Sequence, residues 1–217
     1  MKTILCFGDS NTWGYCPEAG GARLSEQERW PCLLQRELGP GYRVIEEGLN
    51  GRTTAFEDAI RLYRSSLPYI LPCLESHSPV DLLILMLGTN DCKARYHVSA
   101  REITDGLEVL LQKIYSHYRY MPPAPAVLVM PPFPMGAACQ DPEMNAHSIQ
   151  KSQELPALYA QRCEEYPCAF FDPTPLAMGE WAEDFEHITV ATHRRLAAAL
   201  ALRIPALLGE VTLEEML

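Results

Sequence analysis

The stretch DLLILML at residues 81–87 decides the fold, because six successive apolar residues follow its single acid. An apolar run of this length is typical of a central parallel strand that is covered on both faces. Weaker signals of the same kind predict four further strands. These lie at residues 3–7, 43–47, 126–130 and 169–171.

Helical signals separate these strands. The clearest covers residues 99–118, where Ser99 and Glu102 have capping-box spacing and apolar residues follow at helical intervals. Helices are also predicted at residues 30–38, 147–166 (with a kink or break at Pro156) and 189–203, a broken helix at 55–74, and a tail after 203. Strands that alternate with helices predict an α/β fold, with a parallel five-stranded sheet and helices on both faces.

Composition narrows the class of protein. The chain has 217 residues with no internal repeat or linker, so we predict one domain over residues 1–217. Its formal net charge of −10 comes without a basic stripe, which argues against nucleic acids and anionic membranes as partners. No apolar run reaches the roughly 18 residues of a membrane span.

The cysteines bear on compartment and metal binding. Eight are scattered along the chain, and no secretion signal of the usual kind precedes the first strand. We therefore expect a cytoplasmic protein with mostly free thiols. Because the sequence shows neither a CxxC motif nor a Cys/His pair at zinc-ligand spacing, we expect no metal site.

Four polar segments follow predicted strands, where parallel sheets place their sites. They are GDSNT (8–12), GLNGRTT (48–54), GTND (88–91) and DFEH (184–187). Ser10 would lie beside outward-pointing backbone N–H groups, which can stabilise an oxyanion. Asp184 precedes His187 by three residues and could orient its imidazole, as could Glu183 or Glu186, while His193 is a rival base. Taken singly, each segment also fits an ordinary turn or helix cap.

Together the four segments resemble the SGNH hydrolase superfamily, also called GDSL-like esterases and lipases. GDSNTWG at 8–14 is similar to the first block of that family, with Asn11 where the eponymous motif has Leu. The likeness runs from residue 4 to about residue 200. ERWP at 28–31 and the GTNDCK run look like the branch that contains bacterial arylesterases and an acyltransferase.

The resemblance implies a three-layer α/β/α sandwich of flavodoxin-like type and a carboxylic ester hydrolase that needs no metal or organic cofactor. It implies that Ser10 is the nucleophile, His187 the general base and Asp184 the residue that orients His187. It further implies an oxyanion hole formed by the N–H groups of Ser10 and Gly51 and by the side-chain amide of Asn90.

The expected substrate is a small ester with a short acyl or aryl group, bound near Trp13, Tyr15 and Lys93. We expect hydrolysis through an acyl-enzyme on Ser10; the balance with transfer to alcohols stays open. A carbohydrate O-deacetylase, a thioesterase or a lysophospholipase would use the same residues, and a non-catalytic flavodoxin-like binding module is the alternative from another class. The sequence also leaves open a homo-oligomer, with loops 16–28 and 131–147 as candidate interfaces.

One departure from the family pattern concerns the last block. That block commonly has Gly after the Asp and an aliphatic residue before the His, whereas this chain has Phe185 and Glu186 there. A negative charge next to a histidine favours the imidazolium, so Glu186 is expected to raise the pKa of His187.

Overall fold

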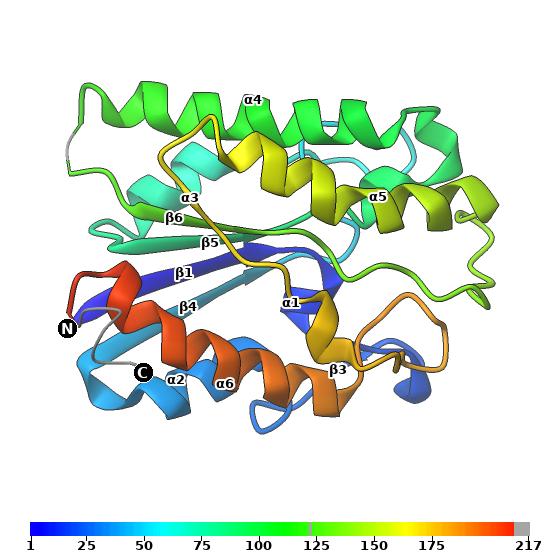
Figure 1. The fold of residues 1–217 in the computed structure, drawn as a ribbon, viewed down its shortest axis with the longest axis horizontal. Coiled ribbons are helices and arrows are strands. Elements are labelled where there is room, and N and C mark those ends of the chain that lie inside the picture. The colour runs from blue at the N-terminus through cyan, green and yellow to red at the C-terminus, as the bar shows by residue number, and fades with distance from the viewer. Residues whose placement is uncertain (122, 211–217) are drawn as a thin grey trace.

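A five-stranded parallel sheet forms the centre of the computed structural model, which describes residues 1–121 and 123–210 (Figure 1). The strand order is β4–β1–β5–β6–β7, with every pair parallel. The second sheet strand along the chain thus lies outside the first, as in flavodoxin-like folds. The strands are β1 (Lys2–Gly8), β4 (Tyr42–Gly48), β5 (Leu82–Met86), β6 (Ala126–Met130) and β7 (Ala169–Phe170). The prediction of a five-stranded parallel sheet is confirmed.

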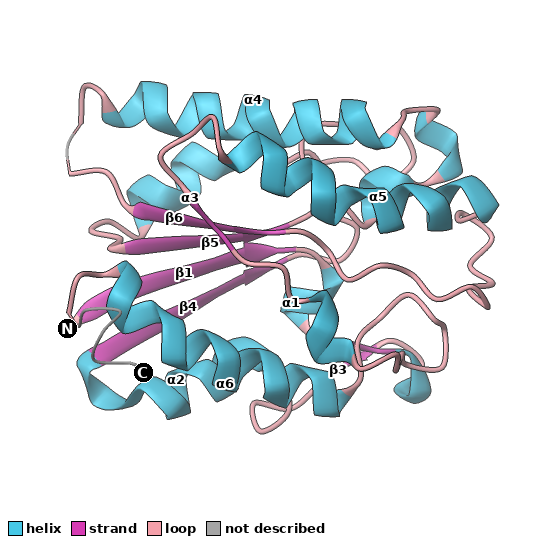
Figure 2. Ribbon diagram, viewed as in Figure 1, coloured by secondary structure: helices cyan, strands magenta, loops and turns pink. Residues whose placement is uncertain are grey.

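Helices cover both faces of this sheet, which confirms the three-layer sandwich (Figure 2). One face carries α3 (Ile70–Ser76), α4 (Ala100–Tyr118) and α5 (Ala146–Cys163), and the other carries α2 (Trp30–Leu38) and α6 (Val190–Leu207). Alternate side chains of each strand enter the two resulting cores: Leu5 and Phe7 pack under α3–α5, and Ile4 and Cys6 pack under α2 and α6.

Two predicted helices differ in detail from the structure. Pro156 does not break α5, which begins at Ala146 and ends at Cys163. Helix α6 extends beyond residue 203 to Leu207 and includes Pro205. The last part of the predicted tail, residues 211–217, lies outside the described residues.

The prediction of a broken helix over residues 55–74 is largely wrong. Only Ile70–Ser76 is helical, and residues 55–69 form turns and bends. The physical reason is that the apolar side chains of this segment do not form a buried stripe, since Ile60, Leu62 and Tyr63 are 76%, 57% and 80% exposed.

Several short elements were not predicted. Helix α1 (Ser10–Trp13) follows β1, and the strands β2 (Tyr15–Cys16) and β3 (Ala22–Arg23) form a small antiparallel hairpin. Five 3₁₀ helices add single turns among the described residues: Pro17–Ala19, Gly39–Gly41, Asn90–Cys92, Ala94–Tyr96 and Thr174–Ala177.

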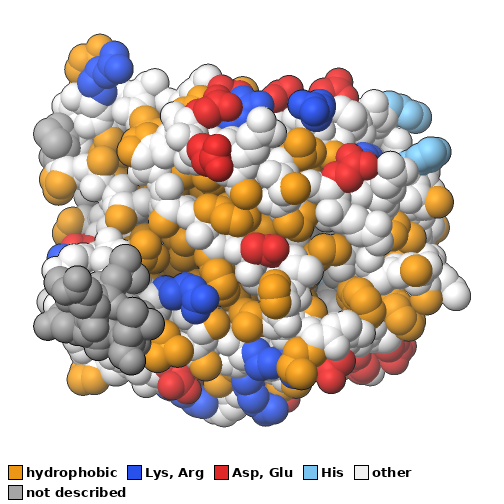
Figure 3. Space-filling model, viewed as in Figure 1, with side chains coloured by type: hydrophobic (Ala, Val, Ile, Leu, Met, Phe, Trp, Pro, Cys, Tyr) orange, Lys and Arg blue, Asp and Glu red, His pale blue; other side chains and the backbone are white. Residues whose placement is uncertain are grey.

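Three properties predicted from composition can be compared with the structure: the distribution of charge, the state of the cysteines and the absence of a membrane span. On the face seen in Figure 3, acidic and basic side chains are interspersed among apolar ones. All eight cysteines are free thiols. Within the part of the chain that the structure describes, no helix combines the length and the apolar character that a membrane span needs.

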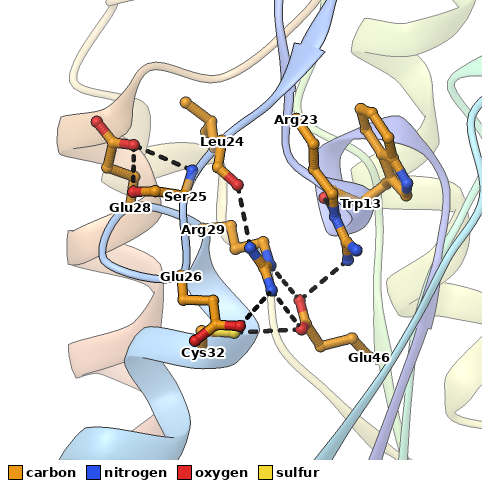
Figure 4. A network of polar contacts seen from close by, with 9 residues as sticks. All are labelled: Trp13, Arg23, Leu24, Ser25, Glu26, Glu28, Arg29, Cys32 and Glu46. Atoms are coloured by element: carbon orange, nitrogen blue, oxygen red, sulfur yellow. Dashed lines mark hydrogen bonds and ion pairs between the residues drawn. The ribbon is translucent and has the colours of Figure 1, made fainter.

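A polar network fixes the hairpin and the start of α2 to strand β4 (Figure 4). Arg29 donates to both carboxylate oxygens of Glu46, at 2.5 and 2.8 Å, and to the carbonyl of Leu24 at 3.0 Å. Arg23 donates to Glu46 at 3.3 Å and to the carbonyl of Trp13 at 2.7 Å. Burial opposes ionisation of Glu46, but the hydrogen bonds from Arg29 and Cys32 and the positive charges of Arg29 and Arg23 together outweigh burial and hold the pKa of Glu46 below its ordinary value.

We expect Arg29→Ala to lower the free energy of unfolding by about 2–3 kcal/mol, because it leaves the partly buried Glu46 carboxylate without its bidentate partner. Urea unfolding followed by circular dichroism measures this difference. Arg36→Ala is the matched control, because Arg36 lies on the exposed face of α2. Equal midpoints for the two variants would contradict the role assigned to Arg29.

Candidate active site

The four polar segments of the sequence meet at the carboxyl edge of the sheet, on the right in Figure 1 beside α1. They line a cavity of about 130 Å³, to which Ser10, Gly51, Asn90 and His187 contribute. A larger groove of about 560 Å³ adjoins it and shares the lining residue Tyr15. The small cavity therefore brings together residues that are far apart in the sequence.

A chain of hydrogen bonds joins three of these side chains. Ser10 Oγ lies 2.8 Å from His187 Nε2, and His187 Nδ1 lies 2.5 Å from Asp184 Oδ2. When Nδ1 donates to the carboxylate, Nε2 is free to accept the serine proton. Of the three acids considered from sequence, Asp184 is the one bonded to the imidazole.

Ser10 is positioned by helix α1. Asp9 caps this helix, and its Oδ1 accepts the N–H of Asn11 at 2.9 Å. The helix lies directly against the end of β4, because a Cβ atom on Gly48 would come within 2.2 Å of the backbone nitrogen of Trp13. Only glycine permits this close approach, so Gly48 helps to place Ser10 at the edge of the sheet.

The loop that carries His187 is folded around Asp184. Asp184 Oδ1 accepts the backbone N–H groups of Glu186 and His187, each at 3.0 Å. Asn11 Oδ1 accepts the N–H of Ile188 at 3.0 Å and so ties this loop to α1. The sequence did not predict this second role of Asn11, although its replacement of the family's Leu marked the position.

Three hydrogen-bond donors surround the space next to Ser10 Oγ. Within residues 1–121 and 123–210, the backbone N–H groups of Ser10 and Gly51 have no other partner. Gly51 holds a φ of 84°, a conformation that favours glycine. Asn90 donates one side-chain hydrogen to the carbonyl of Arg52 at 3.1 Å, which leaves its second hydrogen available. This arrangement is suited to a developing oxyanion.

Buried polar contacts hold these loops against one another. Arg52 donates to the carbonyls of Gly8, at 2.9 Å, and Glu47, and its guanidinium lies 4.0 Å from the ring centroid of Phe7. Both hydrogen bonds of the Arg52 guanidinium thus go to main-chain carbonyls at the ends of β1 and β4. Asp91, which is fully buried, accepts both the N–H and the hydroxyl of Thr54.

The charges around His187 favour its protonated form. Burial works to lower its pKa, but the hydrogen bond to Asp184 and the charge of Glu186 outweigh burial and raise the pKa above 6.5. Burial raises the pKa of Glu186 to about 7. The rival base His193 is fully enclosed, and its Nδ1 accepts the N–H of Trp30 at 3.2 Å. Burial lowers the pKa of His193 to about 3.

The three predicted substrate-binding residues behave differently. Tyr15 lines the cavity, and its ring stacks on the imidazole of His187 with centroids 4.5 Å apart. Lys93 also lines the cavity, but its ammonium group is engaged by Glu143 at 2.7 Å. Trp13 was predicted to bind substrate, but the structure does not bring it to the cavity: its ring lies beneath the guanidinium of Arg23 instead.

One group of potential metal ligands occurs among the described residues. Glu47, Cys73 and His77 place one ligand atom each within 4.8 Å of the others. Cys73 lies in α3 and His77 directly follows that helix, so the sequence signal that was missed is a Cys and a His four residues apart. These side chains have protein partners, since His77 Nε2 lies 2.9 Å from Glu47 and Tyr69 donates to Glu47 at 3.2 Å.

Comparisons with known proteins identify the family of the chain. The model of the GDSL-like lipase/acylhydrolase family matches residues 6–195. The structure of the Mycobacterium smegmatis aryl esterase is 35% identical, with a TM-score of 0.86 over 95% of this chain and 100% of that one. A carbohydrate acetylesterase family member from Sinorhizobium meliloti is 34% identical, with a TM-score of 0.88 over 96% and 100%. No match was found among curated protein sequences.

The family model spans most of the chain, and the two solved structures match it along nearly its whole length. The chain therefore belongs to the GDSL-like lipase and acylhydrolase family and is a carboxylic ester hydrolase.

Proposed function

We propose that the chain hydrolyses esters with short acyl groups through an acyl-enzyme on Ser10. The observation that carries this proposal is the continuous hydrogen-bond chain from Ser10 Oγ through His187 to Asp184. It has the arrangement that a serine nucleophile needs: a base within reach and an acid that fixes the base.

The first step is attack of Ser10 Oγ on the ester carbonyl. His187 Nε2 takes the serine proton, and Asp184 stabilises the imidazolium that forms. The carbonyl oxygen becomes an oxyanion, which the N–H groups of Ser10 and Gly51 and the amide of Asn90 would bind. His187 then gives its proton to the departing alcohol, which leaves the acyl group on Ser10.

The second step repeats this chemistry with water. His187 removes a proton from water, the resulting hydroxide attacks the acyl-enzyme, and Ser10 leaves with the proton. An alcohol in place of water would give acyl transfer. The cavity volume of about 130 Å³ is well below the roughly 300–1,000 Å³ of typical ligand pockets, which supports a short acyl group.

Replacement of the nucleophile tests the proposal. We expect Ser10→Ala to lower kcat/KM for p-nitrophenyl acetate by at least about 10³-fold, because no other group can form the acyl-enzyme. Circular dichroism checks that the variant is folded. Ser116→Ala, on the exposed face of α4, is the control and should keep full activity. Full activity of Ser10→Ala would rule out the proposed nucleophile.

The amide of Asn90 supports a separate expectation. Asn90→Ala should lower kcat by about 10²–10³-fold with little change in KM, because the lost hydrogen bond strengthens only as the oxyanion forms. Steady-state kinetics with p-nitrophenyl acetate measure both constants. A urea unfolding curve shows whether loss of the bond to the Arg52 carbonyl has changed stability. An unchanged kcat would exclude Asn90 from the oxyanion hole.

The pH dependence of kcat/KM follows from the environment of His187. Burial lowers its pKa, but Asp184 and Glu186 together raise it above 6.5, so activity should rise with pH to a half-maximum above 6.5 as the imidazolium loses its proton. Glu186→Gln removes one of the negative charges that favour the imidazolium. The pKa of His187 then falls, and the acidic limb of the profile should move to lower pH. A shift to higher pH would contradict this assignment.

A further inference from the structure

Glu186 places an acid in the catalytic cavity without an evident structural partner. Its side chain is only 6% exposed and lines the same cavity as Ser10 and His187. Among the described residues, no group donates a hydrogen bond to its carboxyl group; only its backbone N–H is bonded, to Asp184. Its two oxygens are not among the fully enclosed side-chain atoms that lack a partner, so they open onto the cavity, where a ligand can bind them.

The catalytic residues do not supply a partner for this carboxyl group. Asp184 already orients His187 through both its ring and its backbone N–H. Lys93 lines the same cavity, but its ammonium group is paired with Glu143 at 2.7 Å. Glu186 is therefore neither the acid of the hydrogen-bond chain nor one half of an ion pair.

The backbone holds Glu186 at this place from both sides. The preceding residue, Phe185, has a φ of 59°, which is uncommon for a residue with a bulky side chain. The carbonyl of Phe185 accepts the N–H of Gly136 at 2.8 Å. The ring centroids of Phe185 and Trp181 lie 6.3 Å apart. The strained turn is thus fixed by its neighbours, and it directs Glu186 to the wall of the cavity.

The chemistry of the wall indicates which group would pair with this carboxyl. Because the pKa of Glu186 is about 7, its carboxyl group is present near neutral pH both as a carboxylate, which only accepts hydrogen bonds, and in a protonated form, which also donates one. A cationic donor could pair with the ionised form alone, and the wall of the cavity carries other acids, among them Asp141 and Glu143, that would compete for it. A hydroxyl group fits both forms of the carboxyl group, because it can donate and accept.

Resting on the proposed esterase function, we propose that Glu186 is a specificity-determining residue that accepts a hydrogen bond from a hydroxyl group of the substrate. The site then prefers acetyl esters of polyhydroxylated alcohols over acetyl esters of alcohols without a further hydroxyl. The two proteins of similar structure are named for different classes of ester, since one is called an aryl esterase and the other a carbohydrate acetylesterase. Glu186 favours the hydroxyl-bearing class for this chain.

The test compares two esters that differ only in hydroxyl groups, glycerol 1-acetate and propyl acetate. The quantity measured is the ratio of their kcat/KM values, for the wild-type protein and for Glu186→Leu. We expect the ratio to favour glycerol 1-acetate in the wild type and to fall by about tenfold in the variant, which lacks the acceptor. An effect of Glu186 on His187 alone would change both esters equally and would cancel in the ratio.

Two further variants separate the effect of Glu186 from a loss of charge elsewhere and from a failure to fold. Glu164→Leu removes the same charge at an exposed position that lines neither the cavity nor the adjoining groove, and it should leave the ratio unchanged. Glu186→Met repeats the test with an unbranched side chain, in case the leucine variant does not fold. An equal ratio in wild type and variant overturns the role of Glu186, while Ser10-dependent cleavage of p-nitrophenyl acetate still supports the esterase. If the wild-type protein cleaves none of the three esters (glycerol 1-acetate, propyl acetate and p-nitrophenyl acetate), both the proposed esterase function and the role of Glu186 are overturned.

Discussion

The active-site edge of the sheet depends on one buried cation. Arg52 is 3% exposed, and its guanidinium donates to the carbonyls of Gly8 and Glu47 at the ends of the adjacent strands β1 and β4. The rings of Phe7 and Tyr69 lie 4.0 and 5.5 Å from it and offer their electron-rich faces. Burial lowers the pKa of Arg52, yet a guanidinium stays charged in proteins, so both carbonyls remain bound. One side chain thereby fixes the chain where two loops of the candidate active site begin.

The remaining loops are held to one another in the same manner. Asp91, after β5, binds Thr54 in the loop after β4, and Asn11 in α1 binds the N–H of Ile188, which follows His187. Each of these contacts is buried and joins segments at least 37 residues apart. A site assembled from separate loops can keep the 2.8 Å contact between Ser10 and His187 only if such cross-links fix the loops before substrate binds.

The sequence predicted those features that depend on local patterns. The apolar run at 81–87 identified the central strand, because a strand buried on both faces needs no alternation. The sequence could not predict the turns at 55–69, since the apolar residues Ile60, Leu62 and Tyr63 there face solvent. Nor could it predict the hairpin of β2 and β3, whose strands have only two residues each and in which Arg23 binds Glu46, 23 residues further along the chain. Spacing alone left three acids near His187; the family resemblance selected Asp184, and the structure shows that Asp184 binds the imidazole. The engagement of Lys93 by Glu143 is likewise a contact between loops that no local pattern encodes.

The positions that depart from the family pattern lie together in the strained turn before His187. The left-handed conformation of Phe185 costs free energy that a Gly would avoid, and Glu186 puts a carboxyl group on the cavity wall where the family commonly has an aliphatic side chain. Stability therefore does not account for this pair of residues. Local violations of this kind are expected where a protein acts on its ligand. Because Ser10, His187 and Asp184 already complete the hydrogen-bond chain, the role left for Glu186 is to choose the substrate rather than to react with it.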